Sequence, residues 1–208
     1  MGGIDKVFAP LGGKPALAWV LGAFESCDQI SQIVAVVSEK NLEQCRRLIA
    51  DEKWAKPIEV CAGGRRRQDS VAAGLKRLNC QWVVIHDGAR PLVTKGLIEE
   101  GLKAAQETGA AVAAIPVTDT IKIAGEGMFV HQTPSRQNLW AVQTPQVFRL
   151  DIIARAYEQA KGEVTDDASL VEGLNHKVKL YMGSYDNIKI TNSDDLALAE
   201  VLLKKHEK

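Results

Sequence analysis

The sequence has few cysteines, and they are far apart. Cys27, Cys45, Cys61 and Cys80 are separated by at least 16 positions, so no CxxC pair exists. This spacing argues against the usual zinc sites and against a disulfide framework, and it indicates free thiols in a reducing compartment.

Long apolar runs are missing as well. No stretch of about 18 apolar residues occurs, which excludes a transmembrane helix. The first residues, Met1 to Lys6, lack the apolar core of a secretory signal. The chain is therefore expected to be cytoplasmic and to have no membrane partner.

Net charge is also absent. The 208 residues include 26 Lys and Arg and 26 Asp and Glu, so the formal charge is zero. Without a global positive field the chain is not expected to bind nucleic acid, and any bound anion needs a local cluster of cations. What remains is an ordinary globular composition, 46% hydrophobic and 25% charged, at a length that suits one domain spanning residues 1–208.

Apolar β-branched runs alternate with amphipathic segments in the first part of the chain. Strands are expected at residues 32–37, 58–61, 82–86 and 110–115. Helices are expected at residues 15–24, 41–50, 68–78 and 94–108. This alternation predicts a parallel or mixed sheet with helices on both faces.

The pattern changes after Pro116. Residues 117–135 alternate loosely around the turn Gly125-Glu126-Gly127, which predicts a two-stranded arm that leaves the sheet. Return strands are expected at residues 141–143, 178–182 and 188–191. Helices are expected at residues 150–160, 166–174 and 193–205.

The first helix, residues 15–24, has no strand before it, although a helix of an α/β fold normally packs on a preceding strand. Gly2-Gly3 is typical of the end of a glycine-rich loop, so we expect a truncated domain whose sheet has a gap or a replacement pairing. The alternative is an ordinary N-terminus.

Two segments carry candidate anion-binding residues. Gly63 and Gly64 precede three arginines and the helix that contains Ser70, and such a loop offers backbone N–H groups and cations to a phosphate. Asp87 and Arg90 follow the third strand, where open α/β sheets bind ligands. The alternatives are a solvated turn and a helix-capping Asp beside a surface Arg.

The remaining candidates lie on other loops. Thr120 and Arg136 flank the arm and could converge on an anion, or could be ordinary surface residues. Together the chain offers cations on loops expected at one edge of the sheet: Lys6, Arg67, Arg90, Arg136 and Lys189.

In combination, these segments resemble the 2-C-methyl-D-erythritol 4-phosphate cytidylyltransferases. The matching pieces cover almost the whole chain in the order of that family: Lys6 with Pro10-Leu11, Gly63-Gly64 with Arg67-Gln68-Asp69-Ser70, His86-Asp87-Gly88-Ala89-Arg90-Pro91, Pro116-Val117-Thr118-Asp119-Thr120-Ile121-Lys122, Gln143-Thr144-Pro145-Gln146, Thr165-Asp166-Asp167 and Asp186-Asn187-Ile188-Lys189-Ile190-Thr191. The sequence departs from the family at its start, where only Met1-Gly2-Gly3 stands for the apolar strand and glycine-rich loop.

The resemblance implies a Rossmann-like α/β fold with a mixed, mostly parallel sheet flanked by helices and a β-arm at about residues 117–135. It implies transfer of a cytidylyl group from CTP to methylerythritol phosphate, with release of pyrophosphate. It also implies a homodimer in which the arm reaches the neighbouring subunit.

Residue roles follow from the same resemblance. The catalytic cations are Lys6, Arg136 and Lys189. The residues implied to bind substrate are Asp87, Arg90, Thr120, Thr144, Thr165 and Thr191. Those implied to bind the nucleotide are Gly63, Gly64, Arg67 and Ser70. Mg²⁺ is implied as the cofactor, with Asp87 and Asp186 as its protein neighbours.

Two other functions stay open at this point. One is a cytidylyltransferase for another alcohol phosphate, such as ribitol 5-phosphate, which would share the nucleotide half of the site. The other is an inactive, truncated relative that binds a nucleotide. Turnover with each acceptor distinguishes these possibilities.

Overall fold

The computed structural model of the chain describes residues 5–206. The interpretation of Gly2-Gly3 as a loop remnant therefore lies outside the described residues. The described chain begins with a short helix η1 (Lys6–Phe8) and a tight antiparallel pair, β1 (Pro10–Leu11) and β2 (Lys14–Pro15). Helix α1 (Ala16–Glu25) follows, and it buries the stripe formed by Leu17, Val20, Leu21 and Phe24.

The expected alternation of strands and helices is present through the first part of the chain. Its elements are β3 (Ile33–Val37), η2 (Glu39–Asn41), α2 (Leu42–Ala50), β4 (Ile58–Ala62), α3 (Arg67–Leu75), β5 (Trp82–Ile85), α4 (Lys95–Ala105) and β6 (Ala110–Pro116). Helix α4 begins where the sequence predicts, because the Thr94 hydroxyl accepts the N–H of Leu97 as an N-cap.

The later elements agree with expectation except at two places. They are β9 (Trp140–Arg149), α5 (Leu150–Glu158), α6 (Asp167–Glu172), β10 (Lys179–Met182) and α7 (Ser193–His206). Strand β9 is much longer than the expected 141–143. The strand expected at residues 188–191 is wrong: this segment is irregular, and Ile190 donates its N–H to the Ala89 carbonyl at 2.8 Å. Its apolar residues reflect the full burial of Ile190, not strand pairing.

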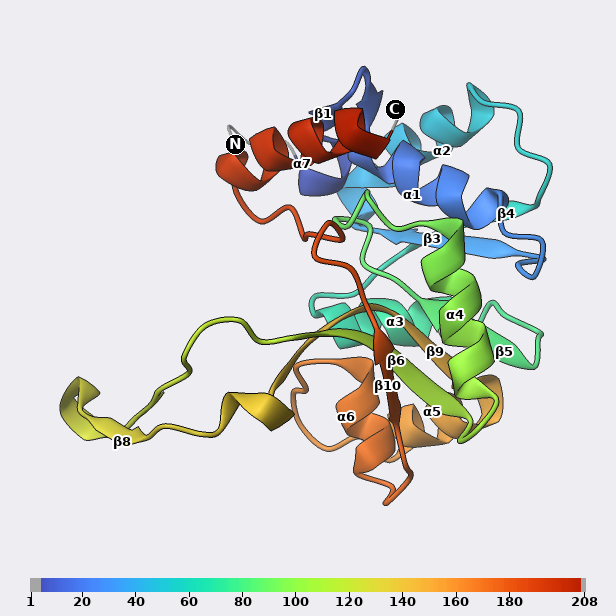
Figure 1. Ribbon diagram of the computed structural model, residues 1–208. Coiled ribbons are helices and arrows are strands. Elements are labelled where there is room, and N and C mark those ends of the chain that lie inside the picture. The colour runs from blue at the N-terminus through green and yellow to red at the C-terminus, as the bar shows by residue number, and fades with distance from the viewer. Residues whose placement is uncertain (1–4, 207–208) are drawn as a thin grey trace.

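The main sheet has four strands in the order β10-β6-β9-β5 (Figure 1). Strand β10 runs parallel to β6, and β9 runs antiparallel to both β5 and β6. Three of the four strands therefore run in one direction, which confirms the mixed, mostly parallel α/β fold. A second, two-stranded parallel sheet pairs β3 with β4.

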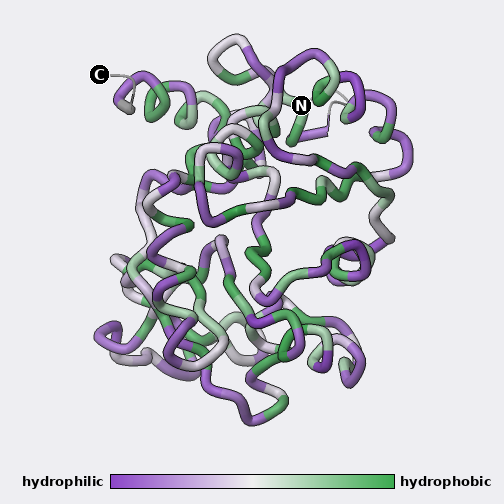
Figure 2. Tube along the Cα trace, turned by 90° about the vertical axis from the view of Figure 1, so that its right-hand side faces the viewer, coloured by the Kyte–Doolittle hydropathy of each residue, from purple (hydrophilic) through white to green (hydrophobic). Residues whose placement is uncertain are grey.

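The main sheet is covered on both faces. Ala111 and Ala113 of β6 face the cluster that includes α4, while Ala110 and Val112 face α5 and α6. This alternation is the period of two that a pleated strand imposes. In Figure 2 the hydrophobic stretches run through the middle of the body, and the hydrophilic ones lie mainly at its outside.

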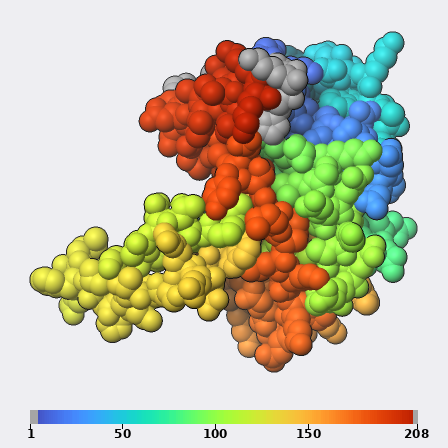
Figure 3. Space-filling model, viewed as in Figure 1, coloured from blue at the N-terminus to red at the C-terminus, as the bar shows by residue number. Residues whose placement is uncertain are grey.

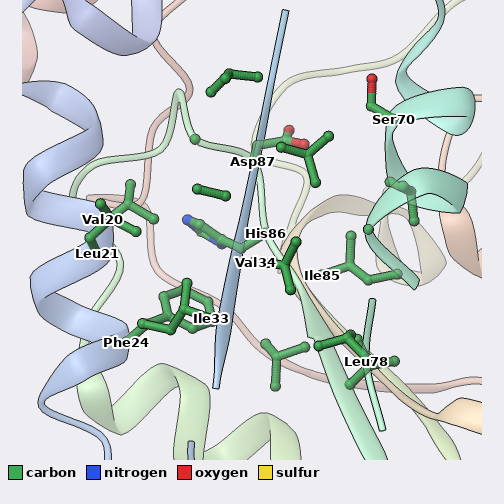
Figure 4. A pocket seen from close by; sticks show the side chains of 18 of the residues that line it. Val20, Leu21, Phe24, Ile33, Val34, Ser70, Leu78, Ile85, His86 and Asp87 are labelled. Carbon is green, nitrogen blue, oxygen red and sulfur yellow. The ribbon is translucent and has the colours of Figure 1, made fainter. Parts of the chain in front are cut away.

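In the described part of the chain, β3 and β5 are not paired with each other. A cavity of about 390 Å³ lies between them, and we call this space the seam. Side chains of α1, β3, α3 and β5 point into it, among them Phe24, Ile33 and Ile85 (Figure 4). The seam matches the gap in the sheet that the sequence predicts.

The arm is present as expected and projects from the body (Figures 1 and 3). It contains β7 (Ile123–Ala124), η3 (Glu126–Met128), β8 (Val130–Gln132) and η4 (Arg136–Asn138), with β7 and β8 antiparallel. Every residue from Thr118 to Thr133 is exposed. Among the described residues, no helix is both long and apolar enough to cross a membrane.

Candidate active site

Asp87 lies just after the carboxyl end of β5, and positively charged side chains from several segments lie within 4 Å of its carboxylate. Arg67 donates through Nε to Asp87 Oδ1 at 3.0 Å, and Lys189 Nζ lies 2.7 Å from Oδ2. The Nε of Arg90 lies 3.9 Å from the same Oδ2. The side chains of Asp87 and Arg90 are only 14% and 13% exposed, which rules out a solvated capping Asp and a surface Arg.

The surrounding charges determine the protonation of Asp87. Burial alone would raise its pKa, but the charge of Arg67, together with the hydrogen bond and charge of Lys189, lowers the pKa to about 2. The carboxylate is therefore fully ionised at neutral pH. It sits in a site that holds more positive than negative charge, an arrangement suited to an anionic ligand.

His86 and Thr144 fix the backbone next to Asp87. The Thr144 hydroxyl accepts the N–H of Asp87 at 3.0 Å and lies 3.0 Å from His86 Nδ1, while His86 Nε2 lies 3.1 Å from the Arg90 carbonyl. The hydroxyl proton must then go to Nδ1, and Nε2–H donates to the carbonyl, which describes a neutral imidazole. Burial lowers the pKa of His86 to about 4, in agreement with this arrangement. His86 is therefore a structural residue of the strand end.

The loop before α3 is shaped by close packing. A Cβ at Gly63 would lie 2.5 Å from Ser70 Oγ, and one at Gly64 would lie 2.3 Å from the Asp69 Cβ, so both positions require glycine. The N–H of Gly64 donates to Ser70 Oγ at 3.2 Å. The polar end of the seam reaches the first turn of α3, since its wall includes Arg67, Ser70 and Asp87.

Thr191 is bound to the start of α7. The Thr191 hydroxyl and N–H donate to the Asp195 carboxylate at 2.5 and 2.7 Å. These bonds, with a contribution from the charge of Lys6, lower the pKa of Asp195. The bonds to Asp195 thus hold the segment that carries Thr191 against the start of α7.

The other sequence-predicted residues are not in this cluster. Arg136 and Thr120 are exposed on the arm, and Arg136 donates to the Thr118 carbonyl at 2.5 Å. Thr165 is exposed in the loop before α6. One chain alone therefore leaves the arm residues apart from Asp87.

Sequence reasoning missed the residues behind Asp87. Asp167 is fully buried and bound to Arg67 at 2.7 Å, and Tyr157 donates to it at 2.5 Å. The pattern contained a usable sign of this: Asp167 shares helical spacing with the apolar Leu170 and Val171, so it had to face the core. Its neighbour Asp166 is the N-cap of α6, since it accepts the N–H of Ser169.

The acidic residues limit how a metal can bind. In the part of the chain that the structure describes, no three His, Cys, Asp or Glu side chains converge as a metal site. Asp186 accepts a bond from Lys205 at 3.0 Å, and Asp87 is engaged by Arg67 and Lys189. This donor set fits a Mg²⁺ ion whose other ligands are phosphate oxygens and water, which is how Mg²⁺ usually binds.

Comparisons with known proteins agree with one another. The family model for 2-C-methyl-D-erythritol 4-phosphate cytidylyltransferase matches residues 1–205. The enzyme of that name from Dehalococcoides mccartyi is 52% identical over 99% of this chain and 91% of its own length.

Solved structures give the same result. The 4-diphosphocytidyl-2C-methyl-D-erythritol synthase from Anaerococcus prevotii superposes with a TM-score of 0.89 at 30% identity, covering 95% of this chain and 93% of that one. The 2-C-methyl-D-erythritol 4-phosphate cytidylyltransferase from Thermus thermophilus gives 0.81 at 35% identity, over 96% and 94%.

Proposed function

The chain belongs to the 2-C-methyl-D-erythritol 4-phosphate cytidylyltransferase family, and we propose that the charged cluster around Asp87 is its active site. The enzyme transfers a cytidylyl group from CTP to 2-C-methyl-D-erythritol 4-phosphate, giving 4-diphosphocytidyl-2-C-methyl-D-erythritol and pyrophosphate. An oxygen of the substrate phosphate forms a bond to the α-phosphorus. The bond to pyrophosphate breaks, and pyrophosphate leaves with the electron pair.

The ion pair between Lys189 and Asp87 is the single observation that carries this assignment. Lys189 is 42% exposed and lies 2.7 Å from a carboxylate that Arg67 holds from behind. In the proposed mechanism Lys189 faces the acceptor phosphate, where its charge draws the attacking oxygen and the α-phosphate together. A preorganised charge at the site of charge development is a large contribution to catalysis.

Lys6 and the glycine loop are proposed to hold the nucleotide. Lys6 would neutralise charge on the α-phosphate and the departing pyrophosphate. Ser70 lines the polar end of the seam, and Gly63 and Gly64 pack against Ser70 and Asp69, so backbone groups of this loop are proposed to contact the base and ribose. Arg67 lines the seam beside the proposed nucleotide site from its fixed position between Asp87 and Asp167. Arg90, Thr144, Thr165 and Thr191 are proposed to contact the acceptor.

Mg²⁺ is proposed as the cofactor, held chiefly by triphosphate oxygens with Asp87 as its carboxylate neighbour. When bound, it neutralises phosphate charge. Asp186 lies on a different loop, between β10 and α7, and pairs with Lys205, so we assign it a supporting position.

A homodimer is proposed to complete the site. The arm exposes Met128, Phe129 and Val130, which are 85%, 78% and 61% exposed. On the body, Val142 and Met182 both flank Ala114 in register, and they form an apolar sheet face beyond α5 and α6. A twofold partner would cover both surfaces. It would also bring Arg136 and Thr120 to the acceptor phosphate of the other subunit.

Turnover measurements test the assignment. Lys189→Ala should lower kcat/KM for cytidylyl transfer by about 10²-fold or more, because a lost charge contact at the transition state costs about 2.7 kcal/mol or more. Lys95→Ala is the matched control, since Lys95 is 41% exposed and lies 2.8 Å from Asp28. Near-normal turnover in Lys189→Ala would refute the role of Lys189.

The acceptor is tested in the same assay. Methylerythritol phosphate should be used far better than ribitol 5-phosphate. A preference for ribitol 5-phosphate would support the alternative function, a cytidylyltransferase for another alcohol phosphate. The four free thiols support a cytoplasmic location, which stays a prediction.

Mixed dimers test the arm. Arg136→Ala chains combined with Lys189→Ala chains should recover part of the activity, because one of the two sites then carries neither substitution. No recovery in verified heterodimers would show that the arm acts within its own chain.

A further inference from the structure

A buried chain of hydrogen bonds stands behind Asp87. Tyr157 donates its hydroxyl to Asp167 Oδ1 at 2.5 Å, and Arg67 donates through Nη2 to Asp167 Oδ2 at 2.7 Å. Arg67 then reaches Asp87 through Nε at 3.0 Å, and Lys189 lies on the far oxygen of Asp87 at 2.7 Å. These residues come from α5, α6, α3, the end of β5 and the loop before α7.

The burial of Asp167 costs free energy of hydration. Its side chain is 0% exposed, and an ionised carboxylate loses several kcal/mol of hydration on burial unless it is paired and hydrogen-bonded. Tyr157 occupies one of its oxygens and Arg67 the other. Burial and the Asp167 carboxylate raise the pKa of Tyr157, which keeps this hydroxyl protonated as a donor.

Arg67 is held from two sides. Burial by itself would lower its pKa, but the bonds and charges of Asp167 and Asp87 outweigh burial and raise the pKa. Two of its three nitrogens are bound to carboxylates, so its guanidinium cannot swing freely toward a ligand. It acts as a rigid link between α6 and Asp87.

We propose that Asp167 is a positioning residue for the transfer reaction. Asp167, which Tyr157 holds in place, fixes Arg67. Arg67 in turn binds Oδ1 of Asp87, so that Oδ2 of Asp87 faces Lys189. This inference rests on the proposed function, because Lys189 must be aligned with the reacting phosphates. Asp167 touches no substrate. Its effect passes through Arg67.

Losing this anchor should harm the transition state more than substrate binding. With Asp167→Asn, Arg67 retains Asp87 but loses its second carboxylate, so the Asp87–Lys189 pair shifts. Misplacement of about 1 Å can lower a rate by about 10²-fold. We expect kcat to fall by about 10–10²-fold while the KM values for both substrates change by less than about 3-fold.

A double-mutant cycle tests the route of this effect. Arg67→Gln, Asp167→Asn and the double variant are compared by kcat, KM and Tm. If Asp167 acts through Arg67, the double variant should turn over within about 3-fold of Arg67→Gln alone. If the loss of kcat in the double variant equals the product of the losses in the two single variants, the proposal is overturned. A normal kcat in Asp167→Asn would overturn it as well.

Tyr157→Phe provides a second variant if Asp167→Asn does not fold. It keeps the ring and removes one donor to Asp167, so kcat should fall by about 3–10-fold with unchanged KM. The matched control is Tyr181→Phe, whose buried hydroxyl donates to the Pro145 carbonyl at 3.1 Å on the α4 side of the sheet.

The two tyrosine variants should lose similar stability, and only Tyr157→Phe should lose kcat. If the two variants have the same kcat, Asp167 and its bond to Tyr157 have only a structural role. Failure of the proposed function is distinguishable, because the unaltered chain would then make no 4-diphosphocytidyl product from CTP and methylerythritol phosphate.

Discussion

The four-stranded sheet and the seam are built from similar apolar strands, yet they are closed to different degrees. Strand β6 is paired on both sides, by β9 and β10, and its residues from Ala110 to Ala114 are at most 1% exposed. Strands β3 and β5 each face the seam with one edge, and a cavity of about 390 Å³ lies between them. Val84, at the centre of β5, is only half-buried.

This difference teaches that an apolar run does not by itself make a closed core. Small residues in β6 allow α4 and its neighbours to approach closely, whereas the side chains around the seam lack partners on one side. Atoms that face a void lose dispersion contacts outright. Equal substitutions in the two regions should therefore have unequal effects.

The largest difference is expected for phenylalanine truncation. Phe148→Ala, in the closed sheet at 0% exposure, should lower the free energy of unfolding by about 3–5 kcal/mol. Phe24→Ala should cost about half as much, because Phe24 already borders the seam. Urea unfolding followed by circular dichroism measures both losses. Equal values would show that the seam is packed as tightly as the sheet.

The next effect is a dependence of stability on pH, and it comes from His86, which lines the seam. The folded-state pKa of His86 is about 4, below the ordinary 6.5, so the unfolded chain binds a proton first as pH falls. Stability should therefore decline between pH 6.5 and 4, by up to about 3 kcal/mol and less if water enters the cavity.

His86→Gln should flatten this pH dependence, whereas His131→Gln, on the exposed arm, should leave it unchanged. An unaltered slope in His86→Gln would assign it to another group. Asp87 contributes in a lower window: its pKa is lowered from 3.8 to about 2, so its share is present above pH 3.8 and lost as pH falls toward 2.

The smallest effect is expected for enlarged side chains. Ala113→Val, at 0% exposure in β6, should destabilise the protein by about 1–2 kcal/mol because no space is available. Val84→Ile adds a methylene group beside the seam, and its stability should stay within about 0.5 kcal/mol of the parent or rise slightly. A loss above 1 kcal/mol in Val84→Ile would mean that the seam cannot accept added volume.

The sequence by itself determined the order of most strands and helices, the arm, and the presence of cations on loops after strands. It also indicated the gap beside the first helix. These features follow from local patterns: the period of two or 3.6, caps such as Thr94, and glycines at close approaches such as Gly63.

Only the tertiary structure decided which segments are neighbours. It placed β9 between β5 and β6, left residues 188–191 outside any strand, and put Asp167 behind Arg67 while Arg136 stays on the arm. Periodicity records whether a residue is buried but not which residue covers it. The partner of a buried charge can stand 100 positions away, as Asp167 does from Arg67, and only the packed chain brings the two together.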